Sequence, residues 1–146
     1  MGLRKPDEFV TAGSAVFKSA PVSREAIKGW VEIARGKASD ALNVKNSMST
    51  QLGVAYDCVL NLSLAVLNSH GWRATSADGH HKESLEAACA LAGVSVKDFN
   101  DMDAVRDLRN DQYRGRAPAT ADVELAIKCM KAISPLLLDV LAPHLR

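Results

Sequence analysis

Several features of common protein classes are absent from this chain. Lys and Arg total 18 and Asp and Glu total 17, so the net charge is only +1. This near-balance argues against a global basic field that would hold nucleic acid or a membrane surface. The three cysteines each lie in an apolar helical pattern and form no Cys-x-x-Cys pair, which predicts buried, reduced thiols in a cytoplasmic protein. At 146 residues, one hydrophobic core suffices without disulfide or metal support.

Sequence motifs of several enzyme and membrane classes are also missing. We find no Gly-rich phosphate loop, no nucleophile elbow and no zinc-binding spacing of Cys and His. The N-terminal charges are not followed by an apolar run, so no secretory signal is expected. The most apolar window, Leu52–Leu67, is interrupted by Asp57 and Asn61 and is expected to be too short to cross a bilayer. The sequence therefore predicts no metal, no cofactor and no membrane partner.

The chain divides into a short N-terminal arm, residues 1–20, and a helical bundle, residues 21–146. Apolar residues of the arm are spaced about one turn apart between Pro6 and Pro21, which indicates a short helix or a packing arm. Gly13 leaves a partly disordered tail as the alternative. We expect apolar residues of the arm to be exposed and available for a dimer contact.

Five helices are expected in the bundle, because apolar residues repeat at helical spacing between capping residues and glycines. Their expected starts are Ser23, about Ser47, about His80, Ser95 or Asn100, and Thr120. The second helix, Ser47–Ser69, is apolar on nearly every face and should be central. Pro135 predicts a kink or a break in the last helix. No segment alternates apolar and polar residues as a half-buried strand does, so the fold class is predicted to be an all-α antiparallel bundle.

The stretch Val105–Arg116 differs most from generic helical scaffold. It places Arg106, Arg109, Asn110, Tyr113 and Arg114 within about three helical turns. One interpretation is a solvated, salt-bridged helix, since residues 97–116 contain five basic residues and five aspartates. The other is that Arg109 and Asn110 face a cleft against the second helix and bind a phosphate, because arginine presents a planar fork of donors to that anion.

Three further side chains are candidates for the same site. Asp57 lies on the most apolar helix and needs a partner, so we expect it to pair with Arg109 or Arg106. His80 and His81 are adjacent in a helix and should point about a hundred degrees apart, which is poor geometry for joint metal binding. One of the two could still reach Arg109 across the bundle.

The order of these patterns resembles the HEPN superfamily of small helical bundles. The resemblance lies in the helix A-Y-D-C-V-L-N-L-S-L-A-V-L-N-S-H-G, the following loop with His80–His81, and L-R-N-x-x-x-R near the end of the fourth helix. HEPN domains occur in prokaryotic toxin–antitoxin and defence systems and beside nucleotidyltransferases. In nucleolytic members an Arg-polar-x-x-x-His element lies at a homodimer cleft and cleaves RNA without metal. The resemblance places Arg109 and Asn110 at the first two positions of that element.

The third position of the element is Arg114 rather than histidine. Arginine stays charged, whereas histidine exchanges a proton near neutral pH, so one does not replace the other as an acid or base. The resemblance then implies a homodimeric, non-catalytic module that binds RNA or a nucleotide, or a protein such as an antitoxin or a nucleotidyltransferase. One alternative is a metal-independent ribonuclease that uses Arg109, Asn110 and Tyr113 with a displaced histidine. Another is a structural adaptor that docks a protein through its apolar faces.

Overall fold

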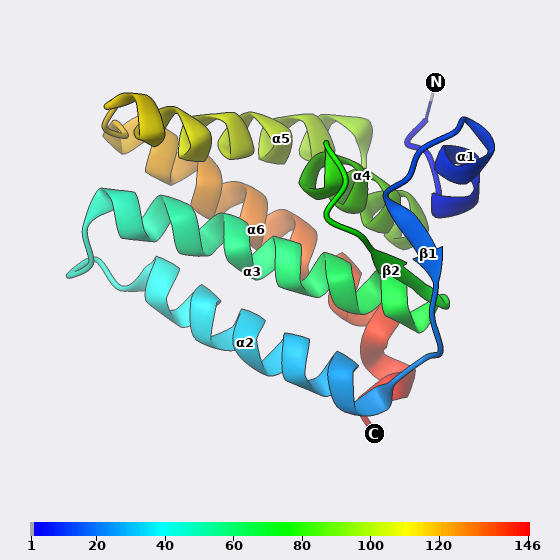
Figure 1. Cartoon of the computed structure of the whole chain (residues 1–146). Helices are drawn as coiled ribbons and strands as arrows, with labels where there is room; N and C mark the ends of the chain where they lie inside the picture. Colours follow the sequence, from blue (N-terminus) through cyan, green and yellow to red (C-terminus); the bar gives the residue numbers. More distant parts are fainter. Residues whose placement is uncertain (1) are drawn as a thin grey trace.

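The computed structural model describes residues 2–146, so Met1, the first residue of the predicted arm, lies outside the described residues. The main helices are α2 (Arg24–Leu42), α3 (Met48–Ser69), α4 (His80–Ala92), α5 (Val96–Asp111) and α6 (Thr120–Leu141). Shorter elements are α1 (Pro6–Thr11), β1 (Phe17–Ser19), β2 (Trp72–Ala74) and the 3₁₀ turns η1 (Gln112–Arg114) and η2 (Ala142–His144). The predicted all-α bundle is confirmed (Figure 1).

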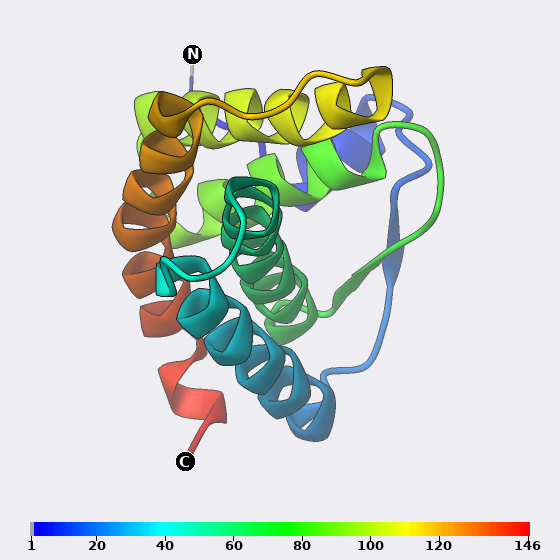
Figure 2. The ribbon, with the colours of Figure 1, turned by 90° about the vertical axis from the view of Figure 1, so that its left-hand side faces the viewer.

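Helix α3 is the centre of the bundle. It runs beside α2 in the opposite direction and contacts α4, α5 and α6 as well (Figures 1 and 2). Its side chains are buried on most faces, as expected for a helix surrounded by others. At 22 residues it is longer than the apolar window seen in the sequence, and by length and composition alone it is long and apolar enough to cross a membrane. In this fold 67% of the apolar 18-residue window within α3 is buried inside the protein.

Side-chain capping sets three of the predicted helix starts. The hydroxyl oxygens of Ser23, Ser47 and Ser95 each accept a hydrogen bond from a backbone N–H in the first turn of α2, α3 and α5. Helix α4 ends at Gly93, whose φ of +72° is the left-handed conformation typical of a helix C-terminus. Thr120 is the first residue of α6 rather than its cap.

A two-stranded sheet corrects the expectation that the chain has no strands. β1 and β2 pair antiparallel, with Phe17 opposite Ala74 and Ser19 opposite Trp72. Each strand has three residues, too few for an alternating pattern to be visible in the sequence. Because β2 lies in the segment expected to be a loop, the pair ties the N-terminal arm to the connection between α3 and α4.

The apolar residues of the N-terminal arm are mostly buried against their own chain, which also differs from the prediction. Phe9, Val16 and Phe17 are at most 4% exposed, and the rings of Phe9 and Phe17 are 5.6 Å apart. Arg4 fixes the arm to α4 through Glu86, whose Oε2 accepts hydrogen bonds from the backbone N and Nε of Arg4, each at 2.9 Å. Val10, at 42%, is the arm's one large apolar side chain that is exposed in the described residues, so the arm offers little apolar surface for a dimer.

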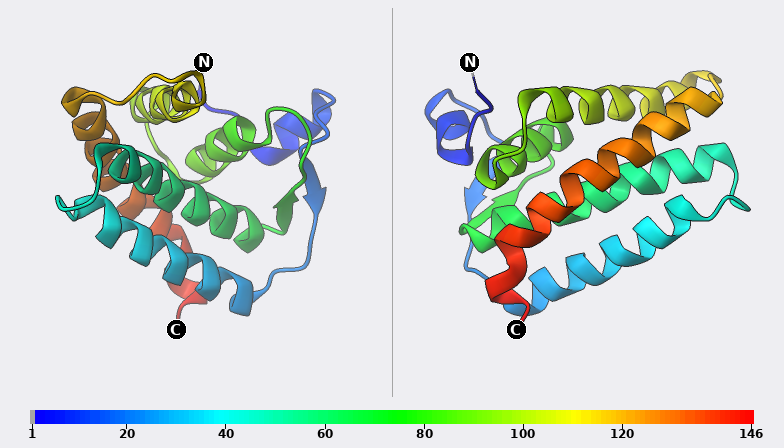
Figure 3. Two further views of the ribbon diagram at one scale, coloured as in Figure 1. Left: turned by 60° about the vertical axis from the view of Figure 1, so that its left-hand side comes forward. Right: turned by 180° about the vertical axis from the view of Figure 1, so that it is seen from behind.

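The sequence predicted a kink or a break at Pro135, and α6 continues through this residue without a break. Pro135 is exposed, and the residues that anchor the helix to the core, among them Ile133 and Leu137, are buried on both sides of it. A proline removes only one backbone hydrogen bond and displaces the carbonyl four residues earlier, here that of Lys131. The right-hand view of Figure 3 shows α6 passing in front of α3 as one continuous element.

Candidate functional site

Arg109 lies on α5 and reaches across to α3. Its Nη2 is 3.4 Å from Oδ1 of Asp57, and its guanidinium carbon is 5.2 Å from the centre of the Tyr56 ring. Oδ2 of the same Asp57 is 4.0 Å from Nζ of Lys37 on α2. The predicted pairing of Asp57 with Arg109 is confirmed. One carboxylate is thus shared between two cations from different helices.

Arg106, the other predicted partner of Asp57, pairs with two aspartates of its own helix instead. Its Nε donates to Oδ1 of Asp103 at 2.9 Å, and its Nη2 lies 3.2 Å from Oδ1 of Asp107. Asp103 also faces Lys82 of α4, with 3.7 Å between Nζ and Oδ2. Two cations and two carboxylates therefore balance one another here. Both contacts of Arg106 lie within α5, and the Lys82–Asp103 pair joins α4 to α5.

Two hollows lie beside Arg109 at the end of α5. The first, which we call the Arg109 notch, has a volume of about 300 Å³ and is lined by Ser49, Gly53, Arg109, Gln112 and Tyr113. The second, the Arg116 notch, has a volume of about 260 Å³ and is lined by Ser49, Gln112, Gly115, Arg116, Ala117 and Pro118. The hydroxyl of Ser49 donates to Oε1 of Gln112, which forms a bridge between the two hollows. Each notch contains one arginine.

The remaining predicted residues on this stretch are at the surface. Tyr113 is 86% exposed and lines the Arg109 notch. Asn110 is exposed but lines neither notch, because adjacent residues on a helix point about a hundred degrees apart. It therefore does not share the cleft with Arg109 as expected. Arg114 and Arg116 share Asp111, at 3.7 and 3.5 Å.

The arginines of the two notches belong to two ion-pair groups, each with more cations than carboxylates. Lys37 and Arg109 share Asp57, while Arg114 and Arg116 share Asp111, so four cations face two carboxylates. All four cations remain partly or largely exposed. The chain as a whole carries +1, so this local excess is the kind of basic patch that the total charge conceals.

His81 is the histidine that faces the Arg109 region. Burial lowers its pKa from the usual value of 6.5, as do the positive charges of His80 and Arg109, while the carboxylate of Asp57 acts in the opposite direction. The centres of the His80 and His81 rings are 4.1 Å apart. The two rings are therefore closer than expected for adjacent side chains that point about a hundred degrees apart on a helix. No group of three or more His, Cys, Asp or Glu side chains positioned to hold a metal occurs in residues 2–146.

Sequence reasoning missed Tyr56, which lies beneath Arg109. Its ring is fully buried, and its hydroxyl has no hydrogen-bond partner among the described residues. Burial raises its pKa to about 12, so the phenol stays neutral at physiological pH. The signal that could have identified it is its position next to Asp57 on the most apolar helix.

Comparisons with protein-family models, curated proteins and solved structures give no match to this chain. The chemistry of the site must therefore be argued from its own geometry.

Proposed function

We propose that this chain is a HEPN-like bundle that binds single-stranded RNA through the Arg109 and Arg116 notches without cleaving it. The observation that carries the proposal is the pair of adjoining hollows, each with one arginine, separated only by the Ser49–Gln112 bridge. Arginine suits phosphate because its planar donors match two oxygens at once. Two such hollows in a row fit successive phosphates of a strand better than one free nucleotide.

The exposed ring of Tyr113 beside Arg109 supports a single strand as the ligand. Single-stranded RNA is commonly bound by stacking an unpaired base on an aromatic ring while cations contact the backbone. The ring of Tyr113 is 86% exposed and does not pack in the core. A ligand base stacked on it would remove apolar ring surface from water. A base on Tyr113 and a phosphate at Arg109 would occupy the two chemically different sides of one notch.

The residue at the third position of the motif, Arg114, speaks against catalysis. Arg114 stands where nucleolytic HEPN domains have histidine, and its exposed side chain pairs with Asp111. It has no means of exchanging a proton near pH 7. The cytoplasmic location, the homodimer and the antitoxin or nucleotidyltransferase partner belong to the same proposal. The location is supported by the three unpaired cysteines, and the homodimer and the partner by the family resemblance alone.

The binding proposal is tested by fluorescence anisotropy with a labelled ten-nucleotide oligouridylate. We expect Tyr113→Ala to weaken binding about tenfold or more, since a stacked base contributes about 1–3 kcal/mol. Arg109→Ala should weaken it and reduce the slope of log K against log salt by about 0.7, the value for one phosphate contact on a single strand. Arg73→Ala, which removes an exposed arginine of β2, is the matched control and should change binding little. Equal losses in all three variants would refute the notch as the site.

A metal-independent ribonuclease is the second candidate, and His81 is the observation that favours it. Its lowered pKa leaves it neutral at pH 7 and able to accept a proton near Arg109. In this alternative His81 replaces the histidine missing at position 114. Incubating the protein with structured RNA in EDTA tests it: cleavage that is abolished by both His81→Gln and Arg109→Ala would establish this alternative, and intact RNA would support binding alone.

A further inference from the structure

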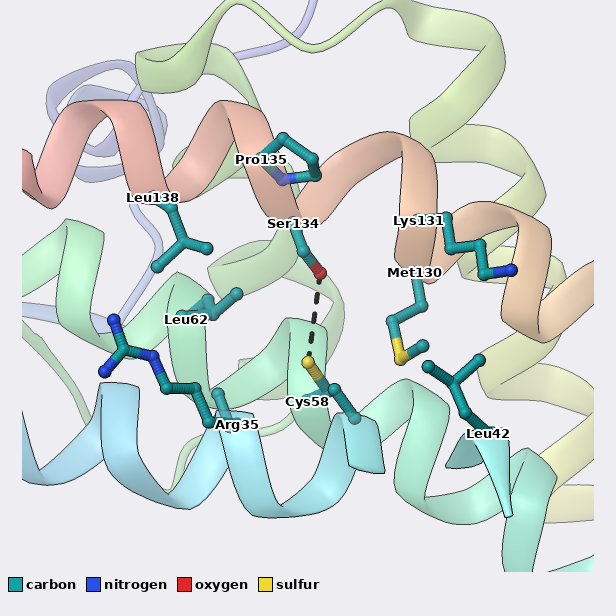
Figure 4. Close-up of a pocket in the computed structure, with 11 residues that line it drawn as sticks. Arg35, Leu42, Cys58, Leu62, Met130, Lys131, Ser134, Pro135 and Leu138 are labelled. Atoms are coloured by element: carbon teal, nitrogen blue, oxygen red, sulfur yellow. Dashed lines mark hydrogen bonds between the residues drawn. The ribbon is translucent and has the colours of Figure 1, made fainter. Parts of the chain in front are cut away.

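A third hollow lies between α2, α3 and α6, and its lining shares no residue with the notches (Figure 4). Its volume is about 290 Å³. Helix α3 forms the floor with Cys58 and Leu62, and α2 and α6 form the walls. The complete lining is Ala34, Arg35, Ala38, Leu42, Cys58, Leu62, Met130, Lys131, Ser134, Pro135 and Leu138. We call this hollow the apolar groove.

Polar groups inside the groove are few and already occupied. The hydroxyl of Ser134 and the thiol of Cys58 share one hydrogen bond, with 3.8 Å between oxygen and sulfur. Burial raises the pKa of the Cys58 thiol, so it behaves as an apolar group rather than a nucleophile. Small side chains at Ala34 and Ala38 leave the space open on the α2 side. The interior is therefore suited to hydrocarbon.

Two cations stand at the rim of this groove. Arg35 on α2 and Lys131 on α6 are both exposed, and neither lies within 4.0 Å of a carboxylate in the described part of the chain. Figure 4 shows the Arg35 guanidinium at the end of the groove near Leu62 and Leu138, while the Lys131 amine points away at the other end. Arg35 is thus placed to meet an anionic group at one end of an apolar body.

We propose that the apolar groove binds a small amphipathic carboxylate with an unbranched hydrocarbon chain, such as a medium-chain fatty acid. The carboxylate pairs with Arg35, and the chain lies over Cys58 toward Met130 and Leu42. At roughly 30 Å³ for each small group, the groove holds roughly ten non-hydrogen atoms. Apolar pockets with a few placed polar groups are the usual form of small-molecule sites.

The surroundings favour a small ligand over a protein partner. Exposed charged residues lie close to the lining residues in sequence, including Glu32, Lys128 and Asp139. The centre of a protein interface is depleted of charge, and a specific interface buries upward of about 1,000 Å². The lining of this groove includes two charged residues, Arg35 and Lys131, and its volume of about 290 Å³ is near the lower end of small-molecule pockets, about 300–1,000 Å³.

Methyl NMR of the methionines tests the proposal on the unaltered protein. With ¹³C-methyl methionine, titration with decanoate below its micelle concentration should shift the Met130 signal, because Met130 lines the groove. Met102 in the core and Met48 at the start of α3 lie outside it and should stay unchanged. Equal shifts in all three signals, or none at Met130, would overturn the proposal.

Calorimetry with matched ligands and variants tests separately the burial of the hydrocarbon chain and the pairing of the carboxylate with Arg35. Hexanoate should bind at least tenfold more weakly than decanoate, since each buried methylene contributes about 0.8 kcal/mol. Decylamine should also bind more weakly, because its charge opposes that of Arg35. Arg35→Gln should weaken decanoate about fivefold, and the control Arg73→Gln should not.

A substitution that fills the apolar groove provides a further test. Ala38→Phe places a ring in the groove and should abolish decanoate binding; a melting curve like that of wild type would show that the variant is folded. If decylamine binds as tightly as decanoate, the carboxylate assignment is wrong. If the protein sediments as a dimer that Ala38→Phe dissociates and decanoate does not bind, the groove is an interface between copies and the proposal fails.

Discussion

Removing the charge of Asp57 separates its structural contribution from its effect on ligand affinity. Asp57 contacts Arg109 at 3.4 Å and Lys37 at 4.0 Å, and the three side chains are 23%, 29% and 37% exposed, respectively. Ion pairs this exposed contribute about 0–1 kcal/mol each. Asparagine keeps the shape of the side chain and removes only its charge. We therefore expect Asp57→Asn to lower the free energy of unfolding by about 1 kcal/mol or less.

The same substitution should strengthen RNA binding. It leaves Arg109 and Lys37 without their shared carboxylate, so the excess positive charge at the notches rises by one unit. We expect about a fivefold gain in affinity near 0.1 M salt and a slope of log K against log salt steeper by about 0.7. Urea denaturation measures the stability, and anisotropy with the labelled oligouridylate across a salt series measures the affinity.

The control for this variant is Asp139→Asn. Asp139 is an exposed carboxylate on α6, so the substitution makes the same change in total charge away from the notches. It should alter RNA affinity less than twofold. If both variants tighten binding equally, the ligand responds to total charge rather than to the Arg109 notch. If Asp57→Asn weakens binding, Asp57 is needed to hold Arg109 in place and the charge argument is refuted.

Three further predictions concern stability. Tyr56→Phe removes a buried hydroxyl that has no partner, so the free energy of unfolding should stay constant or rise by about 1 kcal/mol; a fall beyond 1 kcal/mol in urea denaturation would mean that the hydroxyl is bonded. His81 has a lowered pKa in the folded state, so the unfolded chain binds its proton first and stability should fall as pH drops below 6.5. His81→Gln should reduce that fall between pH 7.5 and 5.5, and an unchanged pH profile would contradict the assignment. Gly93→Ala should cost about 1 kcal/mol, because φ is +72° there, and an unchanged melting temperature would be inconsistent with that conformation.

Much of the helical framework could be predicted from local signals. The serine caps at Ser23, Ser47 and Ser95 act within a single turn, and the buried faces follow the helical period. An unpaired charge on the most apolar helix was enough to predict that Asp57 pairs with Arg109 or Arg106, and the structure shows Arg109. The caps and buried faces depend on residues close together in the sequence, and the ion pair depends on the high cost of burying an unpaired charge.

Features that depend on distant parts of the chain could not be predicted in this way. The β1–β2 pair joins residues more than fifty positions apart with three residues on each side. Burial of Phe9 and Phe17 required knowing that the arm folds back on α4 and β2. The apolar groove between α2, α3 and α6 depends on how three helices are spaced, since its lining residues are unremarkable in sequence. Asn110 lines neither notch, because neighbouring residues on a helix point about a hundred degrees apart.

The central claim is that single-stranded RNA occupies the Arg109 notch and remains uncut. The most direct test is photo-crosslinking of a 4-thiouridine oligonucleotide to the wild-type protein in EDTA, followed by mass mapping of the crosslinked residue and sizing of the RNA. Our account predicts a crosslink at Tyr113 or its neighbours in η1, with full-length RNA recovered. Crosslinks confined to α2 or the N-terminal arm, or shortened RNA that depends on His81, would contradict it.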